Sequence, residues 1–200
     1  MIRKIRYKDI EAVNMLLDEG FSSEYKVKGI NTKRRLKILK KVFFFLKILS
    51  IFPNIYSDFL GFYVYEYNKK LVGVIRIMKI SPDVWMIDTI TVDKNYRKRG
   101  IAETLNVYCT KLCKKKGAKY IILTVKDTNI PSLNLVRKKG FVEYGKEVIF
   151  ISNDIRDYKN HDLKGFRKKR INDSKRILEL ERKVVPERLR AIDGEWAKET

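Results

Sequence analysis

The segment Arg97–Ala102 constrains this chain most, because it joins a strand-like run to a helical pattern through a single glycine. The run Met86–Val92 is rich in β-branched residues, and the helical pattern covers Glu103–Lys116. A helix that begins this way presents unpaired backbone N–H groups at one point, where the helix dipole adds partial positive charge. Gly100 and Ala102 have almost no side chain, so an anion can approach the backbone closely. The segment therefore predicts a site for phosphate or pyrophosphate.

Three cationic side chains surround the same turn and would add charged donors to it: Arg97, Lys98 and Arg99. An ordinary exposed turn between a strand and a helix can carry the same residues, so the pattern alone leaves both interpretations standing. The order of strand, turn and helix favours the phosphate site. The chain contains neither a Gly-x-Gly-x-x-Gly segment nor a Gly-Lys-Ser/Thr P-loop, which argues against a dinucleotide fold and a P-loop nucleotidase.

The same turn resembles the Arg/Gln-x-x-Gly-x-Gly/Ala signature of the GNAT N-acetyltransferases, with Arg97, Gly100 and Ala102 at the signature positions. A second stretch resembles the family segment Asn-x-x-Ala-x-x-Leu-Tyr-x-x-x-Gly-Phe. Its matching residues are Asn129, Ser132, Leu135, Gly140 and Phe141. Upstream, Phe62–Glu66 and Leu71–Arg76 resemble the hairpin that precedes the signature strand.

The resemblance covers about residues 1–152 and implies an α/β GNAT-type acyl-CoA N-acyltransferase fold, in which helices flank a central mixed, twisted sheet. We expect a GNAT N-acetyltransferase domain over residues 1–152, then a linker and a C-terminal strand–helix extension over residues 153–200. Hydrophobic periodicity and turn residues predict the following elements. They are a strand at Ile2–Tyr7, a helix capped by Asp9, a polar loop at Ser22–Thr32, a basic amphipathic helix from Lys33 to about Phe52, a hairpin turn at Tyr67–Lys70, strands at Val84–Val92 and Tyr120–Val125, a helix that begins near Pro131, and strands near Phe141–Tyr144 and Glu147–Ser152.

The C-terminal extension echoes the beginning of the chain. Arg3, Lys4, Arg6, Asp9 and Leu16 recur as Arg167, Lys168, Arg170, Asp173 and Leu180. The echo fits either a chance similarity between two basic segments or the first strand and helix of a partial second GNAT-like unit. A second catalytic unit has no room in the remaining residues. The extension would dock on the domain or on a partner subunit, and the latter would make a homodimer.

The family transfers an acyl group from acetyl-CoA to an amine, so the resemblance implies acetyl-CoA as co-substrate and no metal. The backbone N–H groups of Lys98, Arg99, Gly100, Ile101 and Ala102 would hold the pyrophosphate, beside the signature Arg97. The backbone of Ile90, Thr91 and Val92 would pair with the pantetheine arm like an added strand. Asn129 lies where the family asparagine contacts the cofactor, and Ser132 replaces the usual alanine.

The sequence offers several candidates for the catalytic groups. The backbone N–H of Val92 is a candidate donor to the oxyanion. Asp88, two residues from Ile90 on the same strand, is the candidate base, and Glu66 is a weaker one; a carboxylate at position 88 could equally bind a cationic substrate. The family tyrosine that protonates the leaving thiolate falls on Val136. The reaction would then proceed without that acid, or Tyr108 or Tyr144 would replace it. The lone histidine, His161, falls in the predicted linker.

The formal net charge of +21, from 45 Lys and Arg against 24 Asp and Glu, favours anionic partners or reflects a general bias toward lysine. Unspecific attraction to nucleic acid would follow from it. The cysteines, Cys109 and Cys113, are one helical turn apart, which fits a buried helix face better than a disulfide or metal site and favours a reducing, cytoplasmic setting. Val42–Phe52 is apolar but too short to span a bilayer and is interrupted by Lys47. It fits a helix packed on the domain, or a helix at a membrane surface or substrate lip.

These observations favour an acetyl-CoA-dependent N-acyltransferase acting on a primary amine of a peptide, protein or small molecule. One alternative is a CoA-binding regulatory module without turnover, for which the missing tyrosine at Val136 argues. Another is an acetyltransferase associated with RNA or ribosomal proteins, for which the charge argues. The acceptor is unknown, and the basic segment Ser22–Phe52 favours an acidic or phosphate-bearing amine.

Overall fold

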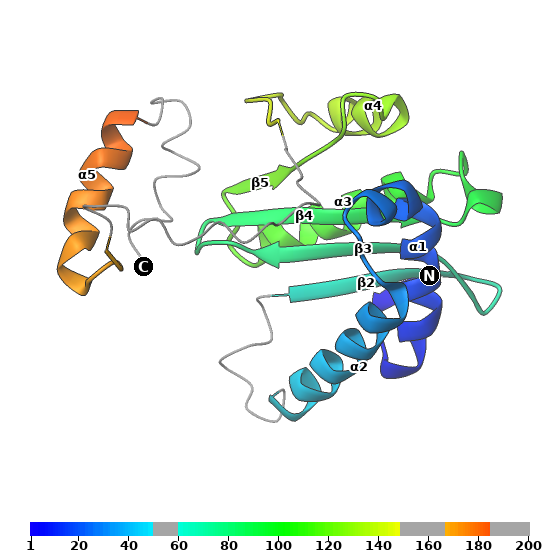
Figure 1. The fold of residues 1–200 in the computed structure, drawn as a ribbon. Coiled ribbons are helices and arrows are strands. Elements are labelled where there is room, and N and C mark those ends of the chain that lie inside the picture. Colours follow the sequence, from blue (N-terminus) through cyan, green and yellow to red (C-terminus); the bar gives the residue numbers. More distant parts are fainter. Residues whose placement is uncertain (50–59, 149–166, 185–200) are drawn as a thin grey trace. The chain divides into compact units, whose positions relative to one another are not determined.

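The structure, a computed structural model, describes residues 1–49, 60–148 and 167–184. The chain forms two compact units, Met1–Gly140 and Phe141–Thr200. The first unit is an α/β layer structure built on a mixed sheet of five strands (Figure 1). This architecture confirms the fold class predicted from the sequence.

The sheet has the spatial order β1-β2-β3-β4-β5, so neighbours in the chain are also neighbours in the sheet. The first four strands are antiparallel, and β5 runs parallel to β4. The strands are β1 (Ile2–Lys4), β2 (Leu60–Tyr67), β3 (Lys70–Lys79), β4 (Val84–Val92) and β5 (Tyr120–Leu123). The predicted hairpin turn between β2 and β3 is confirmed: its central residues, Asn68 and Lys69, have φ of 46° and 63°, as a two-residue turn of twisted strands requires.

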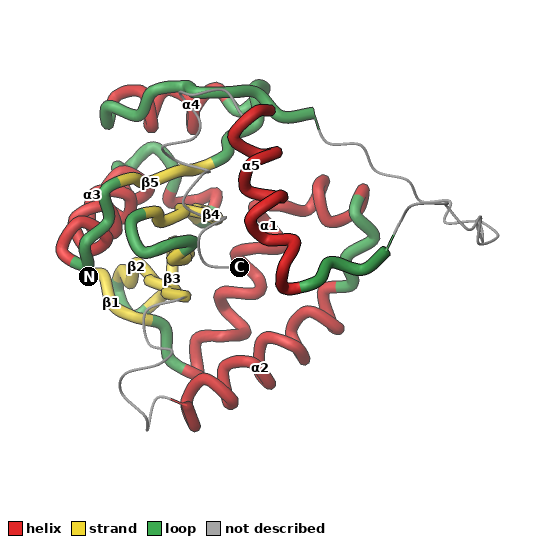
Figure 2. The backbone as a smooth tube through the Cα atoms, turned by 90° about the vertical axis from the view of Figure 1, so that its left-hand side faces the viewer, coloured by secondary structure: helices red, strands yellow, loops and turns green. Residues whose placement is uncertain are grey.

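Helices cover both faces of this sheet (Figure 2). On one face lie α1 (Ile10–Val27) and α2 (Thr32–Leu49), and on the other lies α3 (Ile101–Lys115). The core under α1 joins Val13, Leu16 and Leu17 to Val64 and Val74 of the sheet. The core under α3 contains three fully buried side chains, Leu105, Cys109 and Cys113.

The expected buried helix face at the cysteines is confirmed, since both thiols are free and buried. Burial raises the pKa of Cys109 to about 12 and that of Cys113 to about 11. Both therefore stay protonated at neutral pH and act as small apolar side chains rather than nucleophiles.

Five sequence predictions differ from the structure. The first strand covers Ile2–Lys4 and not Ile2–Tyr7, because Tyr7–Asp9 forms a 3-10 turn. The C-terminal extension has no strand in the described residues before its helix, since residues 167–170 form no regular structure. The polar loop at Ser22–Thr32 is largely helix, because α1 continues to Val27 after a kink at Phe21, where φ is −126°, and the ring of Phe21 contacts that of Tyr25. β5 ends at Leu123, two residues early. The predicted strand at Phe141–Tyr144 is wrong: residues 141–148 form no strand, and most of them are exposed. Alternation of apolar residues there is not matched by a partner strand among the described residues. Residues 149–152 of the last predicted strand, and 50–52 of the basic helix, lie outside the described residues.

A 3-10 turn at Tyr7–Asp9 leads from β1 into α1. The guanidinium of Arg3 holds the buried Asp9 carboxylate through two nitrogens, at 2.6 and 3.1 Å, and the backbone N–H of Arg6 donates to the same carboxylate at 2.7 Å. Arg3 also donates to Glu66 of β2 at 2.8 Å, which ties the turn to the sheet.

The C-terminal unit repeats this turn. A 3-10 turn at Ile171–Asp173 precedes α5 (Ser174–Val184). Arg167 holds Asp173 through two nitrogens at 2.6 and 2.7 Å, and the backbone N–H of Arg170 donates to Asp173 at 2.7 Å. The sequence echo is thus matched by the same set of hydrogen bonds, although here the groups are more exposed than at Arg3 and Asp9.

Gly20 lets α1 lie against β4. A Cβ at this position would lie 3.1 Å from Cβ of Thr91 and nearer still to its Oγ1, and the Thr91 side chain is buried. We expect Gly20→Ala to lower the free energy of unfolding by about 1–3 kcal/mol, despite the better helix propensity of alanine. Urea unfolding of Gly20→Ala, Thr91→Ala and the double variant should give a coupling energy that recovers part of the loss. Strictly additive effects would contradict a direct clash.

Candidate active site

β5 pairs along its whole length, Tyr120–Leu123, with the first four residues of β4, Val84–Ile87. β5 then ends, while β4 continues through Asp88–Val92 and is paired there with β3 alone among the described residues. One edge of β4 is therefore open over its last five residues, on the side that leads into the predicted phosphate turn.

A β-bulge between β3 and β4 lies at the point where the pairing of β4 with β5 ends. Arg76 pairs with Thr89 and Ile77 pairs with Ile87, so Asp88 is an extra residue on β4. A bulge of this kind bends a strand and re-aims the backbone groups beside it, and bulges are frequent next to active sites.

The backbone groups of Ile90 and Val92 face the open edge. The N–H of Asp93 donates to the carbonyl of Val72 in β3 at 2.9 Å, so the regular alternation of an antiparallel ladder turns Thr91 toward β3 as well. The residues that alternate with them, Ile90 and Val92, point their backbone groups toward the open edge. Consistently, Nε of Arg97 reaches the carbonyl of Val92 at 3.1 Å. An added strand would thus pair with Ile90 and Val92, while Thr91 packs its side chain against α1.

The phosphate turn has an unusual backbone. Lys98 and Gly100 both have left-handed φ values, 61° and 74°, and α3 begins at Ile101. Gly100 is the N-cap of α3 and has no side chain with which to accept from the first turn. The N–H groups of Ile101, Ala102 and the next residue therefore point out of the helix without an acceptor among the described residues.

Asp93 holds this turn in place and was not identified from the sequence. Its buried carboxylate accepts from the N–H of Asn95 at 2.9 Å and from Nζ of Lys70 at 2.9 Å. The Lys70 ammonium, helped by the Asn95 N–H, lowers the pKa of Asp93 below its ordinary value, so the carboxylate stays ionised. An aspartate that directly follows a strand and precedes Lys-Asn-Tyr could have been read as a turn-forming residue.

The cationic side chains of the turn are exposed, and within the described ranges none of them forms an ion pair. Arg97 contacts the Val92 carbonyl, and the Arg99 guanidinium lies 5.1 Å from the centroid of the Tyr96 ring. Lys98 lies between them at the left-handed position. Three exposed cationic residues thus directly precede Gly100 and the uncapped N–H groups of α3.

Asn129 and Ser132 lie after β5, at the start of α4 (Ile130–Lys138). Oδ1 of Asn129 accepts from the N–H of Ser132 at 3.3 Å, so this pair caps α4. The far end of α4 is tied to the first turn of α3, because Lys138 and Lys139 both contact the carboxylate of Glu103. The described contacts link the two helices through these residues and not through Asn129.

Comparison with known proteins decides the family. The model of the acetyltransferase (GNAT) family matches residues 37–141, just over half of the chain. The chain belongs to the GNAT acetyltransferase family.

Relatives and solved structures agree with this assignment. A Bacillus subtilis (strain 168) protein provisionally named a ribosomal protein bS18-alanine N-acetyltransferase is 27% identical over 139 residues, which are 70% of this chain and 78% of that protein. The CoA complex of the aminoglycoside N-acetyltransferase AAC(6')-Iy matches with a TM-score of 0.58 at 15% identity, over 77% of this chain and 95% of its own. PaiA N-acetyltransferase from Thermoplasma acidophilum, solved with coenzyme A, has a TM-score of 0.56 at 21% identity, over 74% and 92%. Both structures share the fold.

In this GNAT chain Asp88 is not a free carboxylate. It contacts the guanidinium of Arg76 across the bulge, and Oγ1 of Thr89 donates to it at 2.8 Å. The sequence interpretation singled out Asp88 but gave no role to Arg76, because a pair formed between two strands leaves no local pattern.

The other candidate catalytic groups lie elsewhere or are engaged. Glu66 is bound to Arg3 at the β1–β2 edge. Tyr108 of α3 contacts the ring of Tyr63 in β2, with centroids 5.6 Å apart, two strands from β4. Val136 is half-buried on α4. Tyr144 is in the second unit, and His161 lies outside the described residues.

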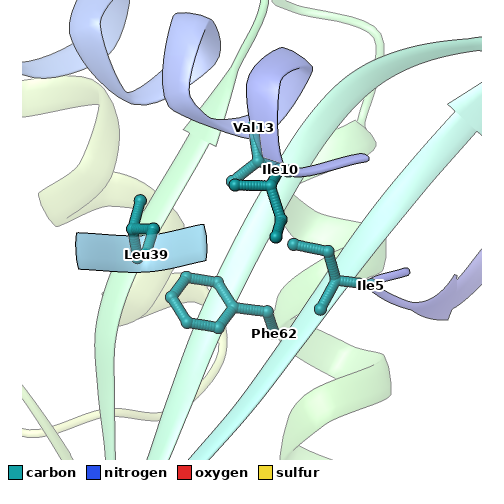
Figure 3. A pocket seen from close by; sticks show the side chains of 5 residues that line it. All are labelled: Ile5, Ile10, Val13, Leu39 and Phe62. Atoms are coloured by element: carbon teal, nitrogen blue, oxygen red, sulfur yellow. The ribbon is translucent and has the colours of Figure 1, made fainter. Parts of the chain in front are cut away.

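A small pocket under α1 and α2 is lined only by apolar side chains (Figure 3). Its volume is about 20 Å³, room for roughly one water molecule, and it is enclosed by Ile5, Ile10, Val13, Leu39 and Phe62. With no polar group in its wall it belongs to the core. The contact of Leu39 agrees with the expectation that the basic helix packs on the domain.

No helix in the described ranges combines the length and apolarity that a membrane crossing requires. Within the same ranges, no three His, Cys, Asp or Glu side chains gather as metal ligands would.

Proposed function

We propose that the chain transfers the acetyl group of acetyl-CoA to a primary amine of a peptide, protein or small molecule. The observation that carries this proposal is the meeting, at one end of β4, of an open strand edge and an uncapped helix N-terminus. The edge at Ile90 and Val92 fits the amide-bearing pantetheine arm, and the turn Lys98–Ala102 fits the pyrophosphate. The CoA bound in related structures supports the same ligand.

In the proposed reaction the neutral amine attacks the thioester carbonyl. A C–N bond forms, the C–S bond breaks and CoA leaves as the thiolate, while the proton of the amine passes to a carboxylate or water. The N–H of Val92 faces the open edge, so it would donate to the carbonyl oxygen as negative charge develops. Asp88 lies four residues earlier on β4 and would take part either as the base or by binding the ammonium.

Isothermal titration tests the cofactor assignment. We expect acetyl-CoA and CoA to bind with micromolar dissociation constants, and the absence of binding by either at millimolar concentration would overturn the proposal. Thiol release in the presence of a panel of amines and free-amino peptides then tests turnover.

A CoA-binding module without turnover is the second candidate, favoured by Val136 at the position of the family tyrosine. Tight CoA binding without thiol release across the panel would favour it. Activity appearing in Val136→Tyr would identify the missing acid as the cause.

An acetyltransferase associated with RNA or ribosomal proteins is supported by the net charge of +21 and by the name of the Bacillus subtilis relative. RNA retention that survives several hundred millimolar salt would favour it, whereas loss in modest salt indicates unspecific attraction.

We propose that the acetyltransferase domain spans residues 1–152 and that residues 167–184 are the opening element of a partial second unit. The repeated Arg–Asp turn before α5 supports this assignment. Docking of this element on a second copy would give a homodimer, which light scattering would detect. The free thiols of Cys109 and Cys113 fit a reducing, cytoplasmic setting.

A further inference from the structure

The ion pair at the β4 bulge lies on the face of the sheet that α1 and α2 cover. Arg76 is two residues from Val74, which packs in the core under α1. The guanidinium contacts Asp88 through Nη2 and lies 5.7 Å from the centroid of the Phe62 ring. Nε of Arg76 is buried and has no hydrogen-bond partner among the described residues. One donor of this arginine is thus desolvated without an acceptor, which is unfavourable unless a ligand supplies one.

A second arginine, on α2, has the same property. Nη2 of Arg35 donates to Asp18 at 2.6 Å and to Asn14 at 2.8 Å, and its guanidinium lies 4.3 Å from the centroid of the Tyr25 ring. Its Nη1 is buried and, within the described part of the chain, has no acceptor.

Tyr25 contacts the Arg35 guanidinium and lies within electrostatic reach of Arg76. Burial raises the pKa of the Tyr25 hydroxyl, while the charges of Arg35 and Arg76 both oppose that shift. Both cations therefore act on the same half-buried phenol. We call Tyr25, Arg35, Arg76 and Asp88 the bulge cluster.

The bulge cluster has an excess of donors. Each guanidinium offers five N–H groups, whereas the acceptors that reach them come from two carboxylates and one asparagine. Groups with paired oxygens, carboxylate or phosphate, match arginine best. The cluster begins at Asp88, two residues from the open-edge residue Ile90 and four from Val92, so an anion bound here would hold the rest of its molecule beside the open edge that leads to the proposed thioester position.

We infer that Arg76 is a specificity-determining residue that selects amines carrying a carboxylate or phosphate close to the amino group. This inference rests on the proposed function and adds the acceptor class to it. The anion would take the unpaired donors of the cluster, and the amino group would face the open edge of β4.

Matched acceptor pairs test the inference through thiol release. The pairs are O-phosphoethanolamine with ethanolamine, β-alanine with β-alaninamide, and free-amino peptides with Asp or Asn at the second position. We expect kcat/KM to favour the anionic member by about tenfold or more, mainly through KM. The acceptor pair with the larger preference shows whether phosphate or carboxylate is the better anion.

The decisive variant is Arg76→Gln, with Arg34→Gln as its control, because Arg34 is an exposed residue of α2 whose replacement removes the same charge. Arg76→Gln should abolish the preference by raising KM for the anionic member alone, while Arg34→Gln keeps it. Equal use of both members by the unaltered chain, or an equal loss for both in Arg76→Gln, would overturn the inference.

Two readouts separate this inference from the proposed function. Titration with CoA should give the same affinity in Arg76→Gln as in the unaltered chain, so a chain that binds no CoA refutes the proposed function instead. If CoA binds but no amine is acetylated, the inference is tested by the shift in melting temperature that each amine causes in the presence of CoA. O-phosphoethanolamine should then stabilise the chain more than ethanolamine, and this difference should disappear in Arg76→Gln. Equal shifts for both compounds would overturn the inference.

Discussion

Gly100→Glu should weaken the binding of CoA by about two orders of magnitude, on the order of 3 kcal/mol. Gly100 has φ of 74° and caps α3, so any L side chain there strains the backbone that aims the first N–H groups of the helix. A carboxylate at this position also places a negative charge where the pyrophosphate would lie. Titration calorimetry with CoA at constant ionic strength measures the change.

Gly117→Glu is the matched control. Gly117 follows the other end of the same helix, has φ of 90°, and like Gly100 has no atom within 4 Å of an added Cβ. The two variants therefore share the charge change, the helix and the left-handed strain. Gly117→Glu should lose stability but keep its affinity for CoA within about threefold. Equal loss of affinity in both variants would show that the turn at Gly100 does not hold the cofactor.

Local sequence patterns predicted those elements whose turn residues or helix starts lie within a few positions of one another. The hairpin at Tyr67–Lys70 and the helix after Gly100 were found correctly, because turn residues and helix starts are decided within a few positions. The same holds for Pro131, which lies in the first turn of α4 as its missing N–H suggests.

Contacts between strands could not be predicted in the same way. The bulge that makes Asp88 an extra residue, and the arginine that pairs with it, depend on the register of β3 against β4. Lys70 reaches Asp93 for the same reason. Periodicity identifies which face a residue occupies but not which residue lies opposite, so Asp88 was identified as a candidate base without its partner Arg76.

The turn that recurs in the two units places the same set of carboxylate hydrogen bonds at two levels of exposure. Arg3 and Asp9 have side chains only 13% and 6% exposed, whereas Arg167 and Asp173 are 50% and 19% exposed. The carboxylate in each pair accepts from two guanidinium nitrogens and one backbone N–H. The first site differs from the second in its lower exposure and in the further bond from Arg3 to Glu66.

Asp9→Asn should lower the free energy of unfolding of the first unit by about 3 kcal/mol, because it leaves the partly buried Arg3 charge with Glu66 as its one remaining carboxylate among the described residues. Asp173→Asn should leave that free energy unchanged. In a Trp196→Phe background, the fluorescence of the buried Trp85 in β4 follows urea unfolding of the first unit alone. A loss of similar size in Asp173→Asn, which lies in the other unit, would show that the effect of Asp9→Asn does not come from its contacts in the first unit.

The same pair predicts how stability depends on pH. Burial alone would raise the pKa of Asp9, but the Arg3 guanidinium and the Arg6 N–H outweigh it and hold the pKa below its ordinary value. The ionised carboxylate therefore stabilises the fold fully above about pH 4, the unfolded-state pKa, and this contribution is lost as the pH falls through the lower folded-state pKa. Asp9→Asn should flatten the decline of stability below pH 4 without abolishing it, since the pKa of Asp93 is lowered as well. A decline as steep as in the unaltered chain would mean that Asp9 does not control acid unfolding.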